Sequence, residues 1–245
     1  MKNKWLLNCL VGFLTFSLKA QHHEQQYFPP TDTLVQQKLA TWQDYKFGLL
    51  MHWGAYSQWG VVESWSICPE DEDWCTRRGP YAANYFEYVK AYEKLQSTFN
   101  PTQFDPTRWA KAAKNAGMKY MVFTTKHHDG LSLYDTKFKT PQAPKEKNWD
   151  PKYPLSTIYQ TPIKKDVISP LFQALEKEDI KKGAYYSLLD WSSNDYPGFY
   201  KDSSRYQLKD DSLRWSHFLK FMHGQIAEIN TQLKPDLFWF DGDWE

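Results

Sequence analysis

The 245-residue sequence lacks an excess of charge of either sign. Its 30 lysines and arginines stand against 29 aspartates and glutamates, a formal net charge of +1. Lys2, Lys4 and Lys19 lie in the first twenty positions, which hold no acid, and without them the balance is 27 against 29, or −2. A nucleic acid or an anionic membrane surface would need a basic face on the protein. We therefore expect no nucleic-acid partner.

Long apolar runs are also scarce, and the main one stands at the N-terminus. Residues 5–18 are mostly apolar, but this run is too short for a comfortable transmembrane span. The basic start and the small residue Ala20 before Gln21 are typical of a secretory signal peptide. Cys9 lies inside the apolar run, which disfavours a lipoprotein anchor. We expect a signal peptide at residues 1–20 and an exported, periplasmic or extracellular protein at residues 21–245, without a membrane span.

Cysteine is rare, with three in the whole sequence. Beyond the predicted signal peptide only Cys68 and Cys75 remain, both in one acidic loop. An exported protein can join two such cysteines in a local disulfide, and two reduced, packed thiols are the alternative. Two cysteines without nearby histidines make a poor zinc site.

Several catalytic motifs are missing, whereas aromatic residues are abundant. The sequence has no G-x-S-x-G elbow, no phosphate-binding loop and no catalytic Cys–His pattern. Aromatic residues make up 18% of the chain, with 12 Trp, 16 Tyr and 15 Phe. Most of these rings are expected in a large core. Trp and Tyr beside polar groups also suit carbohydrate, because the C–H faces of a sugar pack on rings.

Short apolar runs alternate with helical patterns along the sequence. The predicted strands lie at residues 47–51, 120–124, 183–188 and 237–241, and the predicted helices at residues 33–45, 84–95, 105–116, 167–177 and 213–233. The continuous apolar run at 47–51 is typical of a strand buried on both faces. Long loops are expected at residues 56–80 and 137–165.

Polar residues follow the C-terminal end of each predicted strand, which is the organisation of a β/α barrel. A doubly wound open sheet is the alternative, but it usually has a glycine-rich phosphate turn after its first strand. The segment His52-Trp53-Gly54-Ala55 is no such turn. We therefore predict an α/β fold, a (β/α)8 TIM-like barrel, with about the first four β/α units present.

Asp241 ends the last predicted strand and is the first candidate for chemistry. Alternate residues of a strand point the same way, so Leu237, Trp239 and Asp241 share one face. An unpaired carboxylate among helix-facing apolar groups would be strongly destabilising. Asp241 is therefore expected at the polar mouth of the barrel, beside Trp239. The alternative is a cap on a following helix, for which Asp243 is the better candidate.

Histidines follow two of the predicted strands. His127 and His128 come after residues 120–124, and Gly130 permits the turn that both would need to line one site. His52 follows the first strand in the same way. Histidine can donate and accept hydrogen bonds, which suits sugar hydroxyls, while packed and satisfied histidines are the alternative. No helical H-x-x-x-H spacing is present, so we predict no metal and no cofactor.

Four segments at strand ends, taken together, resemble the motifs of one enzyme family, the α-L-fucosidases of glycoside hydrolase family 29. They are residues 46–57 (KFGLLMHWGAYS), residues 125–130 (TKHHDG), residues 183–187 (GAYYS) with Asp190-Trp191, and residues 237–242 (LFWFDG). The resemblance runs from about residue 30 to the last residue. Because the segments occur in the family's order, the match is specific.

The resemblance implies a retaining exo-glycosidase that releases terminal α-L-fucose from fucosylated glycans or glycoconjugates. By this resemblance Asp241 is the nucleophile that forms a covalent fucosyl-enzyme. The substrate-binding residues that it implies are His52, His127, His128, Trp239, Tyr185, Glu63 and Trp65. The last two are the nearest match to a Glu-Trp pair of many members, although Ser64 separates them here.

The sequence departs from the family in one respect that matters for catalysis. Retaining hydrolysis needs a second carboxyl group, roughly 5–5.5 Å from the nucleophile, as acid and then base. In the family this residue lies well downstream of the nucleophile, and Asp243 and Glu245 are too near Asp241 in sequence to replace it with confidence. We therefore expect an N-terminal part of a fucosidase catalytic domain, truncated at the nucleophile strand. An incomplete fragment or a weak fucose-binding protein is the alternative function.

Overall fold

The computed structural model describes residues 28–68, 73–139, 154–200, 203–204 and 206–242. The chain divides into two units, Met1–Trp42 and Gln43–Glu245, and all candidate site residues belong to the second. The predicted signal peptide lies outside the described residues, as do the middle of the predicted loop 137–165 and the candidate residues Asp243 and Glu245.

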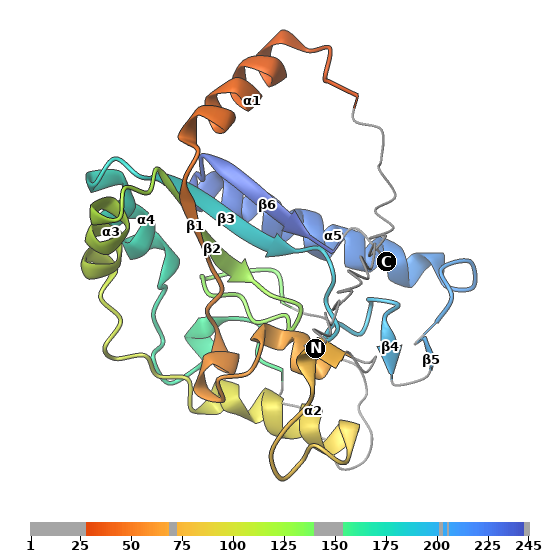
Figure 1. The fold of residues 1–245 in the computed structure, drawn as a ribbon. Coiled ribbons are helices and arrows are strands. Elements are labelled where there is room, and N and C mark those ends of the chain that lie inside the picture. Colours follow the sequence, from red (N-terminus) through yellow and green to blue (C-terminus); the bar gives the residue numbers. More distant parts are fainter. Residues whose placement is uncertain (1–27, 69–72, 140–153, 201–202, 205, 243–245) are drawn as a thin grey trace, which may run out of the picture. The chain divides into compact units, whose positions relative to one another are not determined.

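The second unit is built on a four-stranded parallel sheet (Figure 1). Its strands, in spatial order, are β1 (Gly48–Met51), β2 (Tyr120–Lys126), β3 (Lys181–Ser187) and β6 (Leu237–Asp241). Each neighbour in the sheet is the next of these strands along the chain, and the connections between them contain helices. This is the arrangement of successive β/α units, so the structure is a partial TIM-like (β/α) barrel, as predicted.

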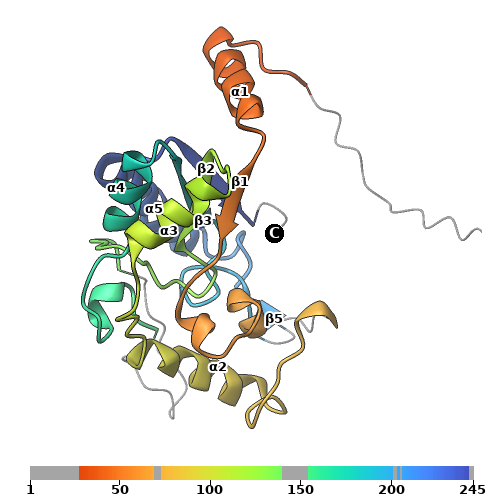
Figure 2. The ribbon, with the colours of Figure 1, turned by 60° about the vertical axis from the view of Figure 1, so that its left-hand side comes forward.

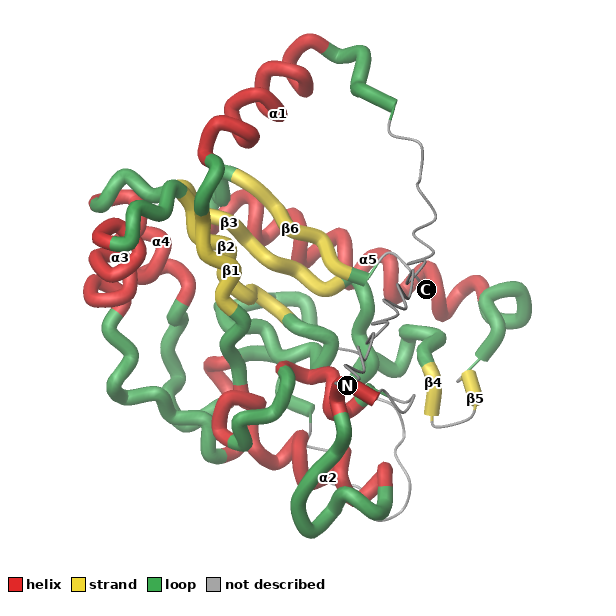
Figure 3. Tube along the Cα trace, viewed as in Figure 1, coloured by secondary structure: helices red, strands yellow, loops and turns green. Residues whose placement is uncertain are grey.

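The predicted helices are all present (Figure 3). They are α1 (Thr33–Tyr45), α2 (Tyr85–Lys94), α3 (Pro106–Asn115), α4 (Ile168–Lys177) and α5 (Ser212–Glu228). Their starts follow from short polar side chains: Asp105 accepts a hydrogen bond from the backbone N–H of Arg108 at 3.0 Å, and Asp211 does the same for Arg214. No helix within the described residues is long and apolar enough to cross a membrane.

Shorter elements were not predicted. The expected loop 56–80 contains 3-10 turns, and the predicted helix 213–233 ends in a π-helical turn. These short helices are η1 (Ala55–Gln58), η2 (Glu63–Ile67), η3 (Asp73–Cys75), η4 (Leu95–Ser97), η5 (Ile158–Gln160) and the π turn η6 (Ile229–Leu233). A small antiparallel pair, β4 (Phe199–Tyr200) with β5 (Ser203–Ser204), was also missed.

One face of the sheet packs against helices α3, α4 and α5, which lie on the same side of it (Figure 2). Met121 and Phe123 of β2 and Ala184 of β3 face these helices and are almost fully buried. The prediction that the first strand is buried on both faces was wrong, because Leu50 is 42% exposed. Burial on both faces needs a second packed layer, and among the described residues β1 is an edge strand with β2 as its one neighbour in the sheet.

Two further expectations concern packing outside the sheet. Helix α1 forms as predicted, but it buries none of its residues, and Leu34 on its expected apolar side is 62% exposed. Cys68 and Cys75 are both buried, and no disulfide joins them. Of the two alternatives for these cysteines, the structure therefore has the packed thiols.

Candidate active site

The C-terminal ends of β2, β3 and β6 bring a carboxylate, a phenol and an imidazole together. The hydroxyl of Tyr185 donates a hydrogen bond to Oδ2 of Asp241 at 2.5 Å and lies 3.0 Å from Oγ of Ser187. Nε2 of His128 lies 3.8 Å from the same oxygen of Asp241. Asp241 keeps 24% of its side chain exposed, whereas His128 is fully buried. The carboxylate of Asp241 thus contacts Tyr185 and His128 through Oδ2 and remains partly exposed to solvent.

The strand register confirms that Trp239 and Asp241 share a face. Trp239 lies opposite Tyr185 in the sheet, and Asp241 lies opposite Ser187, two positions on. Trp239 is 44% exposed, and the role of its ring in substrate binding stays a prediction.

A β-bulge near the end of β2 sets the direction of His127, and the chain then turns, with the backbone N–H of Gly130 donating to the carbonyl oxygen of His127 at 3.1 Å. The pairing of β2 with β3 shifts between Thr124 and Lys126, so that Lys126 lies opposite Tyr186. Such a shift turns the side chains that follow it to the other face. As a result the ring of His127 stacks on that of Tyr185, with centroids 5.3 Å apart and planes 7° apart. The ring of His128 lies 4.4 Å from that of His127.

His52, at the end of β1, completes the group of histidines. Its ring lies edge-on to Tyr185 at 4.6 Å and to His127 at 5.1 Å. Its Nδ1 is 3.3 Å from Oγ1 of Thr124, which fixes the ring toward the sheet. The structure therefore brings together all three histidines that the sequence singled out.

The three imidazoles are held neutral at physiological pH. Burial lowers the pKa of His128 to about 3, and the charge of the Lys126 ammonium acts in the same direction. Burial also lowers the pKa of His127 well below its ordinary value. The pKa of His52 falls by burial too, although the negative charge of Asp241 opposes that shift. Each neutral ring offers one N–H donor and one acceptor, which suits hydroxyl groups.

The loop after β1 contributes the predicted pair Glu63 and Trp65. The ring of Trp65 lies 5.4 Å from that of His128. Glu63 is half-buried at the start of η2 and has a φ of 38°, a left-handed conformation that is unfavourable for glutamate. Burial raises the pKa of Glu63, and the negative charge of Asp241 raises it further. Both predicted residues therefore belong to the same site as Asp241.

Two contact residues were not among the predicted site residues. The hydroxyl of Ser64 forms a hydrogen bond with Nδ1 of His127, across 63 positions of sequence. The ring of Trp191 lies 4.6 Å from His128 and 5.2 Å from Trp65. Trp191 stands in one of the four segments that resemble the family motifs, whereas a serine in a loop gives no signal of its own.

A metal ion is the other chemistry that this set would permit. Ligand atoms of His127, His128 and Asp241 all lie within 4.8 Å of one another. Two imidazoles and a carboxylate are a ligand set that zinc accepts in catalytic sites. Nδ1 of His127 is already taken by Ser64, which leaves Nε2 as its candidate donor atom. The expectation of a site without metal stays a prediction.

A carboxylate among neutral histidines at the C-terminal ends of parallel strands defines a β/α-barrel enzyme site. Comparison of the sequence and the structure with known proteins identifies the family. The sequence matches the family described as Alpha-L-fucosidase over residues 14–245, so the chain belongs to the α-L-fucosidase family.

Individual relatives agree with this assignment. Tissue α-L-fucosidase of Rattus norvegicus is 30% identical over 236 residues, which cover 92% of this chain and 44% of that protein. The structure of α-L-fucosidase isoenzyme 1 from Paenibacillus thiaminolyticus is 33% identical, with a TM-score of 0.62, over 86% of this chain and 44% of that one.

A third relative is a family 29 α-L-fucosidase of Bacteroides thetaiotaomicron, solved as a trapped covalent intermediate with 2-fluoro-fucosyl fluoride. It is 30% identical, with a TM-score of 0.59, over 89% of this chain and 44% of that one. The chain thus spans about half the length of the relatives that it matches.

Proposed function

We propose that the full-length gene product is a retaining exo-glycosidase that hydrolyses terminal α-L-fucose from glycans. The observation that carries this proposal is the partly exposed carboxylate of Asp241, which accepts a hydrogen bond from Tyr185 and lies beside the neutral His128. Membership of the α-L-fucosidase family supports fucose as the sugar. The covalent intermediate trapped in the Bacteroides relative supports retention of configuration.

In the first step Asp241 attacks the anomeric carbon of fucose. The contacts with Tyr185 and His128 both fall on Oδ2, so we assign the attack to Oδ1. The new bond joins this oxygen to the anomeric carbon, the glycosidic C–O bond breaks, and an acid protonates the departing oxygen. In the second step water attacks the same carbon, its proton goes to the base, and Asp241 leaves as a carboxylate.

The hydrogen bond from Tyr185 to Asp241 suits these steps. A charge-assisted hydrogen bond holds the carboxylate in one orientation, which lowers the entropic cost of the attack. We assign His52, His127 and His128 to the hydroxyl groups of the sugar, because neutral imidazoles can both donate and accept. Trp239 and Trp65 supply rings on which the apolar face of fucose packs.

The mechanism also needs an acid that protonates the departing glycosidic oxygen. Among the described residues, Glu63 is a carboxyl group whose pKa is raised by burial and by the charge of Asp241, as a general acid requires. By family resemblance the donor instead lies downstream of the nucleophile. If residues 1–245 act without such a donor, we expect them to bind fucose weakly and not to cleave it.

The proposal is tested with 2-fluoro-fucosyl fluoride, the probe used for the Bacteroides relative. We expect the full-length product to hydrolyse 4-nitrophenyl α-L-fucoside, to be inactivated by this probe and to carry the label on the peptide that contains Asp241. We expect the Asp241→Gly variant to lose hydrolysis and to regain some turnover with azide, which takes the nucleophile's place and releases fucosyl azide.

The matched control is Asp236→Asn, at the other end of β6. Oδ2 of Asp236 accepts the backbone N–H of Lys182 at 2.8 Å, which keeps it away from the site at the strand's C-terminal end. We expect this variant to stay active. A label on another peptide, or full activity in Asp241→Gly, would contradict the assignment of the nucleophile.

Export is a separate proposal. It is supported by the basic start and the short apolar run at residues 1–20, which lie outside the described residues. Mass spectrometry of the mature protein from its native host tests it, with Gln21 expected as the first residue. An intact Met1 on the mature protein would contradict cleavage.

A further inference from the structure

The residue before the paired histidines, Lys126, carries a fully buried ammonium group. Its Nζ lies 3.4 Å from Oδ2 of Asp190 and 3.3 Å from the carbonyl oxygen of Leu189, and both charged side chains are 0% exposed. The same nitrogen sits 4.7 Å from the centre of the Tyr186 ring. Removing two charges from water carries a large desolvation penalty, and such a pair is weak evidence for stability alone. This pair therefore calls for another role.

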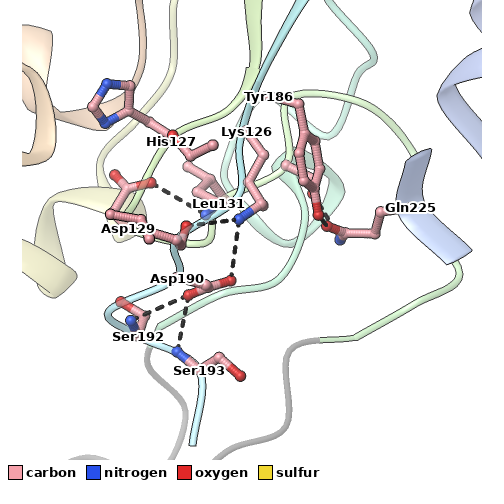
Figure 4. Close-up of polar contacts among 12 residues, drawn as sticks. Lys126, His127, Asp129, Leu131, Tyr186, Asp190, Ser192, Ser193 and Gln225 are labelled. Carbon is pink, nitrogen blue, oxygen red and sulfur yellow. Dashed lines mark hydrogen bonds and ion pairs between the residues drawn. The ribbon is translucent and has the colours of Figure 1, made fainter. Parts of the chain in front are cut away.

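The carboxylate of Asp190 anchors the turn that follows β3 (Figure 4). While Oδ2 faces Lys126, Oδ1 accepts the backbone N–H groups of Ser192 at 3.1 Å and Ser193 at 2.9 Å. Gly130 lets this carboxylate approach the turn after β2, because a Cβ there would lie 2.9 Å from Oδ1. The side chain of Asp190 thus connects the C-terminal ends of β2 and β3.

Trp191, between these anchoring contacts, touches His128 in two ways. Its backbone N–H donates to the carbonyl oxygen of His128 at 2.9 Å, and its ring lies 4.6 Å from the imidazole. A displacement of the turn after β3 would therefore disturb two contacts of His128, one to its backbone and one to its ring. Nε2 of that ring is the atom 3.8 Å from the proposed nucleophile, Asp241.

We propose that the buried Lys126–Asp190 ion pair is a positioning device, which locks the turn after β3 onto the end of β2 and so fixes His128 beside Asp241. Lys126 and Asp190 are positioning residues, because they act through Trp191 and His128. The bulge at Thr124 and Lys126 is what turns the ammonium group to this side of the sheet. This inference rests on the proposed fucosidase function.

The test compares Lys126→Met with the double variant Lys126→Met/Asp190→Asn in the full-length product. The single variant leaves a buried carboxylate without its counter-ion and should lose both stability and activity. The double variant removes both charges of the pair, and the amide oxygen that replaces the carboxylate can still accept from the turn. Asp129 also loses the ammonium charge that lowers its pKa, so we expect the double variant to regain part of the melting temperature. We expect its kcat/KM to stay on the order of tenfold to a hundredfold below wild type, because His128 is no longer held.

Two further measurements separate positioning from simple stability. Glu228→Gln is the control, because Glu228 is a buried carboxylate that accepts from Thr136 and the backbone of Lys137 away from the site. We expect it to change the melting temperature but not kcat/KM. The ¹⁵N chemical shifts of the His128 ring should change in the double variant and remain as in wild type in the control.

The outcomes are distinguishable. A wild-type protein that leaves fucosides intact refutes the proposed function. If the wild type is active and the double variant recovers both its melting temperature and its kcat/KM, the ion pair is structural and the positioning role is refuted. If Lys126→Met keeps wild-type kcat/KM, the inference is overturned as well.

Discussion

Replacing Asp129 by asparagine should remove one loss of stability that develops in the protein as pH rises. Asp129 is 3% exposed, and burial raises the pKa of its carboxyl group from the ordinary 3.8 to about 6. Hydrogen bonds from the hydroxyl of Tyr92 at 2.7 Å and from the backbone N–H of Leu131 at 3.2 Å oppose this shift. The native state therefore binds a proton more tightly at this site than the unfolded chain does.

The sign and size of the change in the free energy of unfolding follow from proton linkage. Because the pKa is raised in the native state, the free energy of unfolding falls as pH rises through the interval between the unfolded and folded pKa values, 3.8 and about 6. A shift of about two units corresponds to roughly 3 kcal/mol, of which about 2 kcal/mol develop between pH 4.5 and 7.5. In Asp129→Asn this loss is absent, since the amide is neutral throughout. The amide can still accept from Leu131 and donate to Tyr92.

The assay is the melting temperature of wild type and Asp129→Asn across this pH range. We expect the difference, variant minus wild type, to rise by roughly 4 to 8 °C between pH 4.5 and 7.5. The comparison of two proteins at each pH cancels the contribution of the titrating groups on which the charge of Asp129 does not act. A difference that stays constant, or falls with pH, would refute the reasoning.

Two further predictions concern activity in the full-length product. Tyr185→Phe removes the hydrogen bond that orients the carboxylate of Asp241, so kcat/KM should fall on the order of tenfold to a hundredfold. Burial raises the pKa of Tyr185, so this loss should be equal at every working pH, and a change under about twofold would count against the role. If Glu63 is the general acid, kcat/KM of the wild type falls at alkaline pH as Glu63 loses its proton. Glu63→Gln should abolish this fall, because glutamine does not titrate. An unchanged pH profile would place the acid elsewhere.

The sequence predicted much of the fold because the relevant signals are local. Apolar periodicity marked the helices and the four sheet strands, and the predicted helix 105–116 agrees with α3 to within one residue at each end. The short strands β4 and β5 were not predicted, because two-residue strands carry no periodicity. The prediction of burial on both faces failed for β1, because the burial of Leu50 depends on what covers the sheet and not on the strand's own residues.

The sequence alone determined that Asp241 and Trp239 share a face, because a strand alternates with a period of two. It also marked His52, His127 and His128 through their place after strands. Only the tertiary structure decided how these residues meet. The bulge before Lys126 re-aims the side chains after it, and Lys126 meets Asp190 across 64 positions of sequence. Contacts between distant segments follow from register and packing, and no local pattern of residues records them.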